Sequence, residues 1–215
     1  MGILRRLREW REGADGTLKG PALKTEQVRN GVAGSNNTIS RLFGERIESV
    51  TPSGSEAVEF TEVFGTYDTY IIHISDATIA SNDQNIRIRV STDGGSSWES
   101  GESAYRWTAS NRLDSGAAGT SGSEGDSKIR LNRSDGIGGE DGEGFIGHIQ
   151  FSRPSSGELY QMFNWHLSTF DNDGTFIRHI GGGAYMTPEA INGVKIDMSD
   201  EGFDGGEFDL VGVMF

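Results

Sequence analysis

The stretch QNIRIRVST, residues 84–92, decides the fold class of this chain. Ile86, Ile88 and Val90 alternate with Arg87 and Arg89, so apolar and charged side chains fall on opposite faces of an extended backbone. Strict alternation of this kind is typical of a strand with one face on a core and the other in water. The stretch therefore predicts an antiparallel sheet with one solvated face.

Further stretches with strand character lie on both sides of it, separated by turns rich in Gly, Asp, Asn and Ser. They cover residues 57–64, 67–75, 103–110, 127–134, 144–153, 158–170, 174–186, 191–199 and 206–215. Parallel strands would need crossover helices, and no long helix is expected after residue 46. The sequence therefore predicts an all-β fold, specifically an antiparallel jelly-roll-like sandwich over residues 47–215.

Composition agrees with short strands joined by tight turns. The 215 residues include 32 Gly and only 4 Pro, and 34% of them are hydrophobic. This fits a thin core with many turns better than Pro-rich disorder. Cysteine is absent, which excludes disulfides and thiolate metal sites. No segment approaches the roughly 20 apolar residues that a helical membrane span requires, so no membrane span is predicted.

Charge is distributed unevenly along the chain. Residues 1–30 contain seven Arg and Lys against four Asp and Glu, a net charge of +3. The whole chain carries −13, which leaves −16 for residues 31–215. A body this acidic repels nucleic acid, so no nucleic-acid partner is expected.

The N-terminal segment has a different character. MGILRRLREWREG, residues 1–13, predicts a short amphipathic helix. A helix of this length is marginal alone, so its apolar face needs another protein, the chain's own body or a bilayer surface; we favour another protein. Residues 14–46, rich in Gly, Asn, Ser and Thr, predict an extended linker arm. The basic start lacks the apolar core of a secretory signal, so synthesis in a cytoplasm is expected. The predicted anchor residues are Ile3, Leu4, Leu7 and Trp10.

Immediately after the opening stretch, STDGGSSWES (91–100) resembles the Asp box, S-x-D-x-G-x-[ST]-W, of sialidase propellers. A propeller needs several repeated blades, and here the pattern occurs once. Asp93, Gly94 and Gly95 suit a tight hairpin turn, over which Trp98 can fold back. The motif therefore predicts a structural turn, and glycan contact by Trp98 is the alternative.

Catalytic and cofactor signatures are weak throughout. GIGGEDG (136–142) is unlike a dinucleotide fingerprint, because Asp141 would repel a phosphate and no strand-to-helix context surrounds it. The acidic loops 134–144, 170–176 and 199–209 could present oxygen ligands to Ca²⁺, yet Asp-Gly is also a common hairpin turn. Calcium binding stays open, and the sequence predicts no enzyme activity and no cofactor.

The histidines offer no zinc motif. None of them forms a pair at i, i+2 or i, i+4, which gives no support for a metal site. The expected role of each is that of a strand residue with a satisfied hydrogen bond. They are His73, His148, His166 and His179.

Residues 67–107 resemble a recurring pattern of structural proteins from tailed bacteriophages. In that pattern a Y-D-x-Y strand leads to an I-R-x-R strand, an S-T-D-G-G-[ST] turn and a Y-x-W strand. The ending GGEFDLVGV (205–213) resembles the closing strand S-G-T-F-x-L-Y-G-[IVL], with departures that include Glu207 for Thr and Val211 for an aromatic. The resemblance implies a virion surface protein with a jelly-roll-like sandwich, such as a fibre, spike, baseplate or head-decoration component.

These observations lead to a prediction of function. We expect a non-enzymatic structural protein of a tailed-phage particle, assembled into the virion in the host cytoplasm. Its partners would be other virion proteins, through the N-terminal segment, and further copies of itself in a trimer or ring. A carbohydrate-binding module or a glycan-active enzyme domain is the alternative. A host-surface glycan is a further expected partner. The contact candidates are three aromatic residues, which can stack on sugar rings, and one polar residue: Trp98, Tyr105, Trp107 and Glu99.

Overall fold

The computed structural model describes residues 11–12, 18–19, 44–132 and 136–214. The chain divides into two compact units, Met1–Leu42 and Phe43–Phe215. In the first unit, β1 (Arg11–Glu12) pairs antiparallel with β2 (Leu18–Lys19). Most of the predicted helix and arm lies outside the described residues, including the anchor candidates Ile3, Leu4, Leu7 and Trp10.

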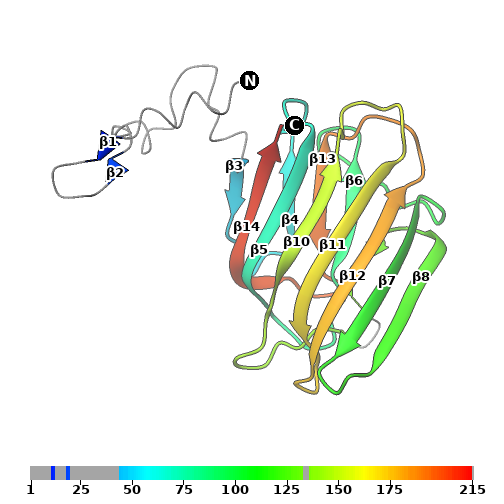
Figure 1. The fold of residues 1–215 in the computed structure, drawn as a ribbon. Coiled ribbons are helices and arrows are strands. Elements are labelled where there is room, and N and C mark those ends of the chain that lie inside the picture. The colour runs from blue at the N-terminus through cyan, green and yellow to red at the C-terminus, as the bar shows by residue number, and fades with distance from the viewer. Residues whose placement is uncertain (1–10, 13–17, 20–43, 133–135, 215) are drawn as a thin grey trace. The chain divides into compact units, whose positions relative to one another are not determined.

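The second unit contains two antiparallel sheets, shown in Figure 1. The larger sheet has eight strands in the order β3 (Glu45–Val50), β14 (Phe203–Val213), β5 (Thr69–Ile79), β10 (Phe145–Ser152), β11 (Gln161–Phe170), β12 (Phe176–Tyr185), β7 (Tyr105–Leu113) and β8 (Ala118–Asp126). The smaller has four in the order β4 (Ala57–Thr61), β13 (Gly193–Asp197), β6 (Arg87–Ser91) and β9 (Ile129–Arg130). The described ranges contain no helix, and so none that is long and apolar enough to cross a bilayer.

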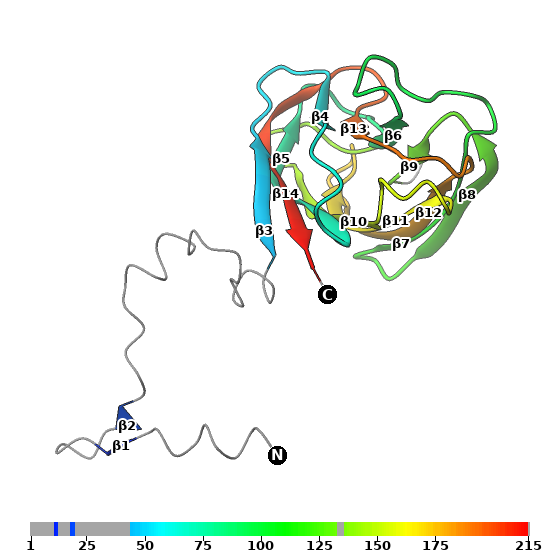
Figure 2. The same ribbon diagram turned by 90° about the horizontal axis from the view of Figure 1, so that it is seen from above.

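Alternating burial along the strands explains how the sheets pack. In β6, Ile88 and Val90 are fully buried, whereas Arg87 and Arg89 lie on the outer face. The apolar faces of both sheets contribute to one buried cluster. Viewed from above in Figure 2, the larger sheet curves around the smaller one, with the core between them. The prediction of an all-β, sandwich-like fold is confirmed.

Two strands of the second unit were not predicted from the sequence. The first, β3, begins at Glu45, inside the stretch expected to form the linker arm, and pairs with the last strand, β14. The second, β8, has the sequence AGTSGSEGD and lacks any large apolar side chain. It forms by pairing along β7 at the edge of the larger sheet, where polar and charged side chains are favoured.

Candidate functional site

The hairpin that resembles an Asp box satisfies its own polar groups. Ser91 Oγ accepts hydrogen bonds from the backbone N–H of Gly95 at 2.8 Å and of Asp93 at 3.2 Å. The Asp93 carboxylate accepts bonds from the Ser97 hydroxyl at 2.6 Å and from the Ser97 backbone N–H at 2.9 Å. These donors, together with Ser91, lower the pKa of Asp93 to about 2. Gly94 and Gly95 have φ of 73° and 87°, a conformation that favours glycine. The geometry supports the structural interpretation of this turn.

The four residues predicted to contact a glycan do not form an exposed aromatic platform. Tyr105 is completely buried, and its hydroxyl accepts a bond from Val90 N and donates one to the Glu99 carbonyl. Trp107 is 8% exposed and donates its indole N–H to Asp126. Trp98 is partly buried, and the Lys195 ammonium lies 5.0 Å from its ring centroid. Tyr105 and Trp107 therefore present no exposed ring for sugar stacking, whereas glycan contact by the partly exposed Trp98 and Glu99 stays a prediction.

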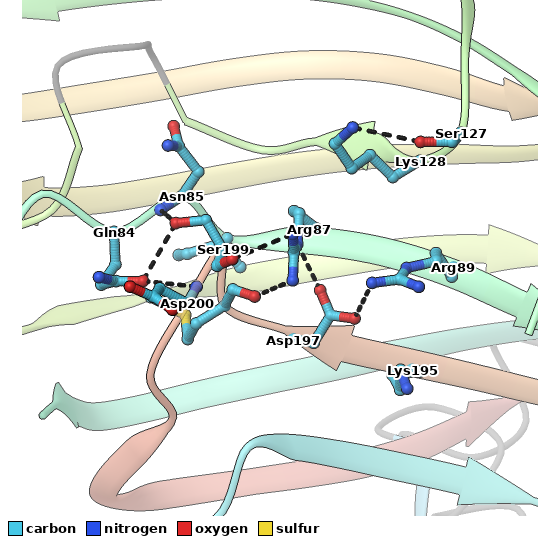
Figure 3. A network of polar contacts seen from close by, with 12 residues as sticks. Gln84, Asn85, Arg87, Arg89, Ser127, Lys128, Lys195, Asp197, Ser199 and Asp200 are labelled. Carbon is cyan, nitrogen blue, oxygen red and sulfur yellow. Dashed lines mark hydrogen bonds and ion pairs between the residues drawn. The ribbon is translucent and has the colours of Figure 1, made fainter. Parts of the chain in front are cut away.

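A network of hydrogen bonds and ion pairs lies on the outer face of the smaller sheet (Figure 3). Asp197 is 5% exposed, and each of its oxygens accepts a bond from a guanidinium: Arg87 Nε at 2.6 Å and Arg89 at 2.8 Å. Arg87 also donates to the carbonyls of Met198 and Ser199. Because both carboxylate oxygens are already occupied by cations, this network serves to join β6 to β13 rather than to receive a ligand.

In the acidic loop 170–176, a carboxylate is likewise occupied by hydrogen bonds within the protein. Asp171 Oδ1 accepts bonds from the backbone N–H of Asp173 at 3.0 Å and of Thr175 at 2.9 Å, which closes the turn between β11 and β12. Within the described residues, no group of three or more His, Asp or Glu side chains is arranged to hold a metal ion.

A groove with a volume of about 640 Å³ crosses the outer face of the larger sheet. Its floor is built from β11, β12 and β7, which lie side by side in the sheet (Figure 1). Gly182 and Ala184 have little or no side chain, so the middle of the floor is not filled. The Asn164 side chain lies next to Gly182, and its Oδ1 is 3.3 Å from the position that a Cβ on Gly182 would take. The connection between β10 and β11, residues 153–160, contributes one wall.

The groove offers unused hydrogen-bonding groups beside apolar surface. Tyr160 is 48% exposed and Met162 is 61% exposed, which leaves a ring and a thioether open to a ligand. Several exposed polar side chains that line the groove make no side-chain hydrogen bond or ion pair to any other described residue. Among them are Arg106, Glu124, Gln150 and Asn164. A concave surface with a few free polar groups and an accessible ring is the common form of a small-molecule or sugar site.

Sequence reasoning missed this groove, although part of the signal was present. In β7, Tyr105 and Trp107 alternate with Arg106 and Thr108, so the aromatics should face the core and the polar pair should face outward. The local pattern could not show that β11 and β12 lie beside β7 and contribute side chains to the same surface.

No family model, curated protein or solved structure matches this chain.

Proposed function

We propose that this chain is a non-catalytic structural protein of a tailed-phage particle. Its β-sandwich unit is displayed at the virion surface in several copies, and the groove on the larger sheet contacts a glycan of the host envelope. The N-terminal segment attaches the protein to other virion proteins. Display in several copies increases the avidity for a weakly held ligand.

The observation that carries this proposal is the strand order, which supports a jelly-roll connectivity. Eight strands form the frame of the sandwich, in chain order β3, β4, β5, β6, β9, β10, β13 and β14. The first of them, β3, lies beside the last, β14, and the second, β4, lies beside the seventh, β13. The third, β5, lies between β14 and the sixth strand, β10. The fourth, β6, lies between β13 and the fifth strand, β9. This order supports a jelly roll, an architecture found in viral and lectin domains.

The remaining strands are two inserted hairpins, and they carry most of the groove. Strands β7 and β8 follow the fourth frame strand, and β11 and β12 follow the sixth. Both hairpins extend the larger sheet on the same side, in the order β10, β11, β12, β7 and β8. Since function generally resides in sites added to a fold rather than in the fold itself, these insertions are the natural place for a binding site.

The chemistry of the groove favours a carbohydrate. Sugar hydroxyls both donate and accept hydrogen bonds, and the groove provides amide, guanidinium and carboxylate groups from Asn164, Arg106 and Glu124. The Tyr160 ring can pack against the apolar face of a sugar.

We expect Tyr160→Ala and Asn164→Ala each to weaken binding to host envelope polysaccharide by roughly tenfold, because one such contact is worth on the order of 1–2 kcal/mol. Both side chains are exposed, so the melting temperature should stay unchanged. Phe176→Ala is the matched control, since Phe176 is 41% exposed on the same sheet but does not line the groove. Binding should be measured by calorimetry or on a polysaccharide array.

Two outcomes would contradict the groove assignment. The first is unchanged binding in both groove variants. The second is steady release of reducing sugar that disappears in Glu124→Gln, which would instead support the glycan-active enzyme.

Attachment is tested separately by deleting residues 1–30. The β-sandwich unit has its own buried core, so the truncated protein should fold and keep its glycan binding. It should, however, be missing from purified particles. Protein gels of particles assembled with the full-length and the truncated chain give the comparison, and normal incorporation of the truncated chain would refute attachment through this segment.

A further inference from the structure

The outer face of the larger sheet has a second depression, of about 390 Å³, which we call the arginine hollow because the charged residues that line it are Arg112 and Arg178. Arg112 on β7 is directly opposite Arg178 on β12, and both side chains are exposed. Like charges in directly opposite positions of two antiparallel strands repel each other and lower stability. An anion bound between the two guanidinium groups would remove this repulsion.

Neither arginine has a carboxylate partner among the described residues. Arg178 makes no hydrogen bond or ion pair to them, and Arg112 donates to a backbone carbonyl of the turn after β7 at 3.3 Å. The exposed Asp114, two residues after Arg112, forms no ion pair with either arginine. By contrast, Arg46 on β3 lies 3.5 Å from two carboxylates of β14. The two arginines of the hollow are therefore available to an anion from outside the protein.

The arginine hollow also offers neutral groups that suit a sugar. Ser110 on β7 and Thr120 on β8 are directly opposite each other and exposed, and their hydroxyls make no hydrogen bond to a described residue. On the other side of Ser110 lies Ile180 of β12, which is 47% exposed. Hydroxyls that can both donate and accept, beside a small apolar surface, fit a sugar that carries a charged group.

The arginine hollow continues the groove along the same two strands, β7 and β12 (Figure 1). Alternate residues of β7 from Arg106 to Arg112 lie on this face, and the first two line the groove whereas the last two line the hollow. On β12 the same order runs in reverse, from Ala184 to Arg178. At about 3.4 Å per residue, the strip from Arg106 to Arg112 is about 20 Å long. A chain of several sugars can therefore lie in the groove and reach the hollow.

The two depressions differ in charge. The charged residues that line the groove are Arg106, Arg153, Glu124 and Glu158, so its positive and negative charges balance. The described residues that line the arginine hollow include two cations and no carboxylate. The whole chain carries −13 and repels anions in general, so an anionic group is stabilised only where the local charge is positive.

We propose that the glycan held in the groove is acidic, and that Arg112 and Arg178 bind one of its anionic groups, a carboxylate or a phosphate ester. Guanidinium groups recognise both kinds of oxyanion through paired N–H···O hydrogen bonds. Uncharged sugars of the same chain occupy the groove, and the anionic group lies in the arginine hollow. This inference rests on the proposed glycan binding and adds the chemical class of the glycan.

The test compares three forms of the host envelope polysaccharide with the full chain: native, carboxyl-reduced and dephosphorylated. One of the two treatments should weaken binding by at least about tenfold, which identifies the anionic group. Arg112→Gln and Arg178→Gln should each weaken binding of the native form by a similar factor and discriminate less between it and the treated form. Calorimetry at low ionic strength would measure the affinities, because salt screens exposed charges.

Arg46→Gln is the matched control. It removes the same charge from an exposed arginine of the same sheet that lines neither depression. Its affinity for the native polysaccharide should equal that of wild type. The melting temperatures of Arg112→Gln and Arg178→Gln should not fall, since each substitution relieves the repulsion between the two arginines.

The outcomes separate this inference from the proposed function. Equal binding of all three polysaccharide forms, or unchanged binding by both Arg112→Gln and Arg178→Gln, would overturn the inference. If Tyr160→Ala still weakened binding in that case, the proposed glycan contact in the groove would stand. Failure of the wild type to bind the native polysaccharide would overturn both.

Discussion

Replacing Trp165 with alanine is expected to lower the free energy of unfolding by about 4 kcal/mol, because it empties the largest fully buried position of the core. Trp165 lies on β11, and its indole N–H donates to the Leu131 carbonyl at 2.8 Å. The substitution removes both the ring's packing and the partner of that carbonyl. Chemical denaturation monitored by circular dichroism would measure the loss.

The same position explains a glycine on the neighbouring strand. Gly181 of β12 is directly opposite Trp165, and a Cβ there would collide with the indole ring and lie 2.7 Å from the Thr108 carbonyl oxygen. Gly181→Ala should therefore cost about 1–3 kcal/mol through overpacking. Combined with Trp165→Ala, it should cost at least about 1 kcal/mol less than the sum of the two single changes, because the ring is then absent.

Gly182→Ala provides the matched control for this pair of variants. It lies one residue further along β12 on the opposite face, where the nearest atom to an added Cβ is Asn164 Oδ1 at 3.3 Å. We expect a much smaller effect on stability. If the losses of unfolding free energy in the Trp165 and Gly181 variants were strictly additive, the indole ring would not be the reason that position 181 is a glycine.

Replacing Asp197 with alanine is the second change with a large expected effect, about 3 kcal/mol of unfolding free energy. Removing one partner of a buried ion pair leaves the other charge uncompensated, which generally costs about 3–5 kcal/mol. The lower end applies because the side chains of Arg87 and Arg89 are 18% and 24% exposed and regain some water. The loss arises at the contact between β6 and β13.

Asp200→Ala is the control for this variant. Asp200 is exposed in the adjacent loop, and its hydrogen bond to Gln84 comes from the backbone N–H, which the substitution keeps. Its unfolding midpoint in urea should match that of the wild type. If the two aspartate variants were equally stable, the ion pairs of Asp197 would contribute nothing measurable.

The sequence and the structure agree best where the signal is local. The turn at Asp93, Gly94 and Gly95 was predicted from residues that tolerate positive φ and from a carboxylate able to bond nearby N–H groups, and both features are present. Tyr105 and Trp107, two of the glycan candidates, are buried, which agrees with their alternation with the exposed Arg106 and Thr108 along β7.

The candidate binding sites depend on contacts between distant parts of the chain. The groove requires Asn164 and Gly182 to be neighbours on adjacent strands, with Arg106 of β7 on the next strand.

By itself, the sequence determined the all-β class, ten of the strands and the chemistry of the turns. Alternation and turn preference act over a few residues, so they can be read without knowledge of the partner strand. Only the tertiary structure decided the strand order, the presence of β3 and β8, and the surface on which each side chain meets its neighbours. The physical reason is that strand pairing is non-local: β8, with no large apolar side chain, forms only because β7 presents its free edge.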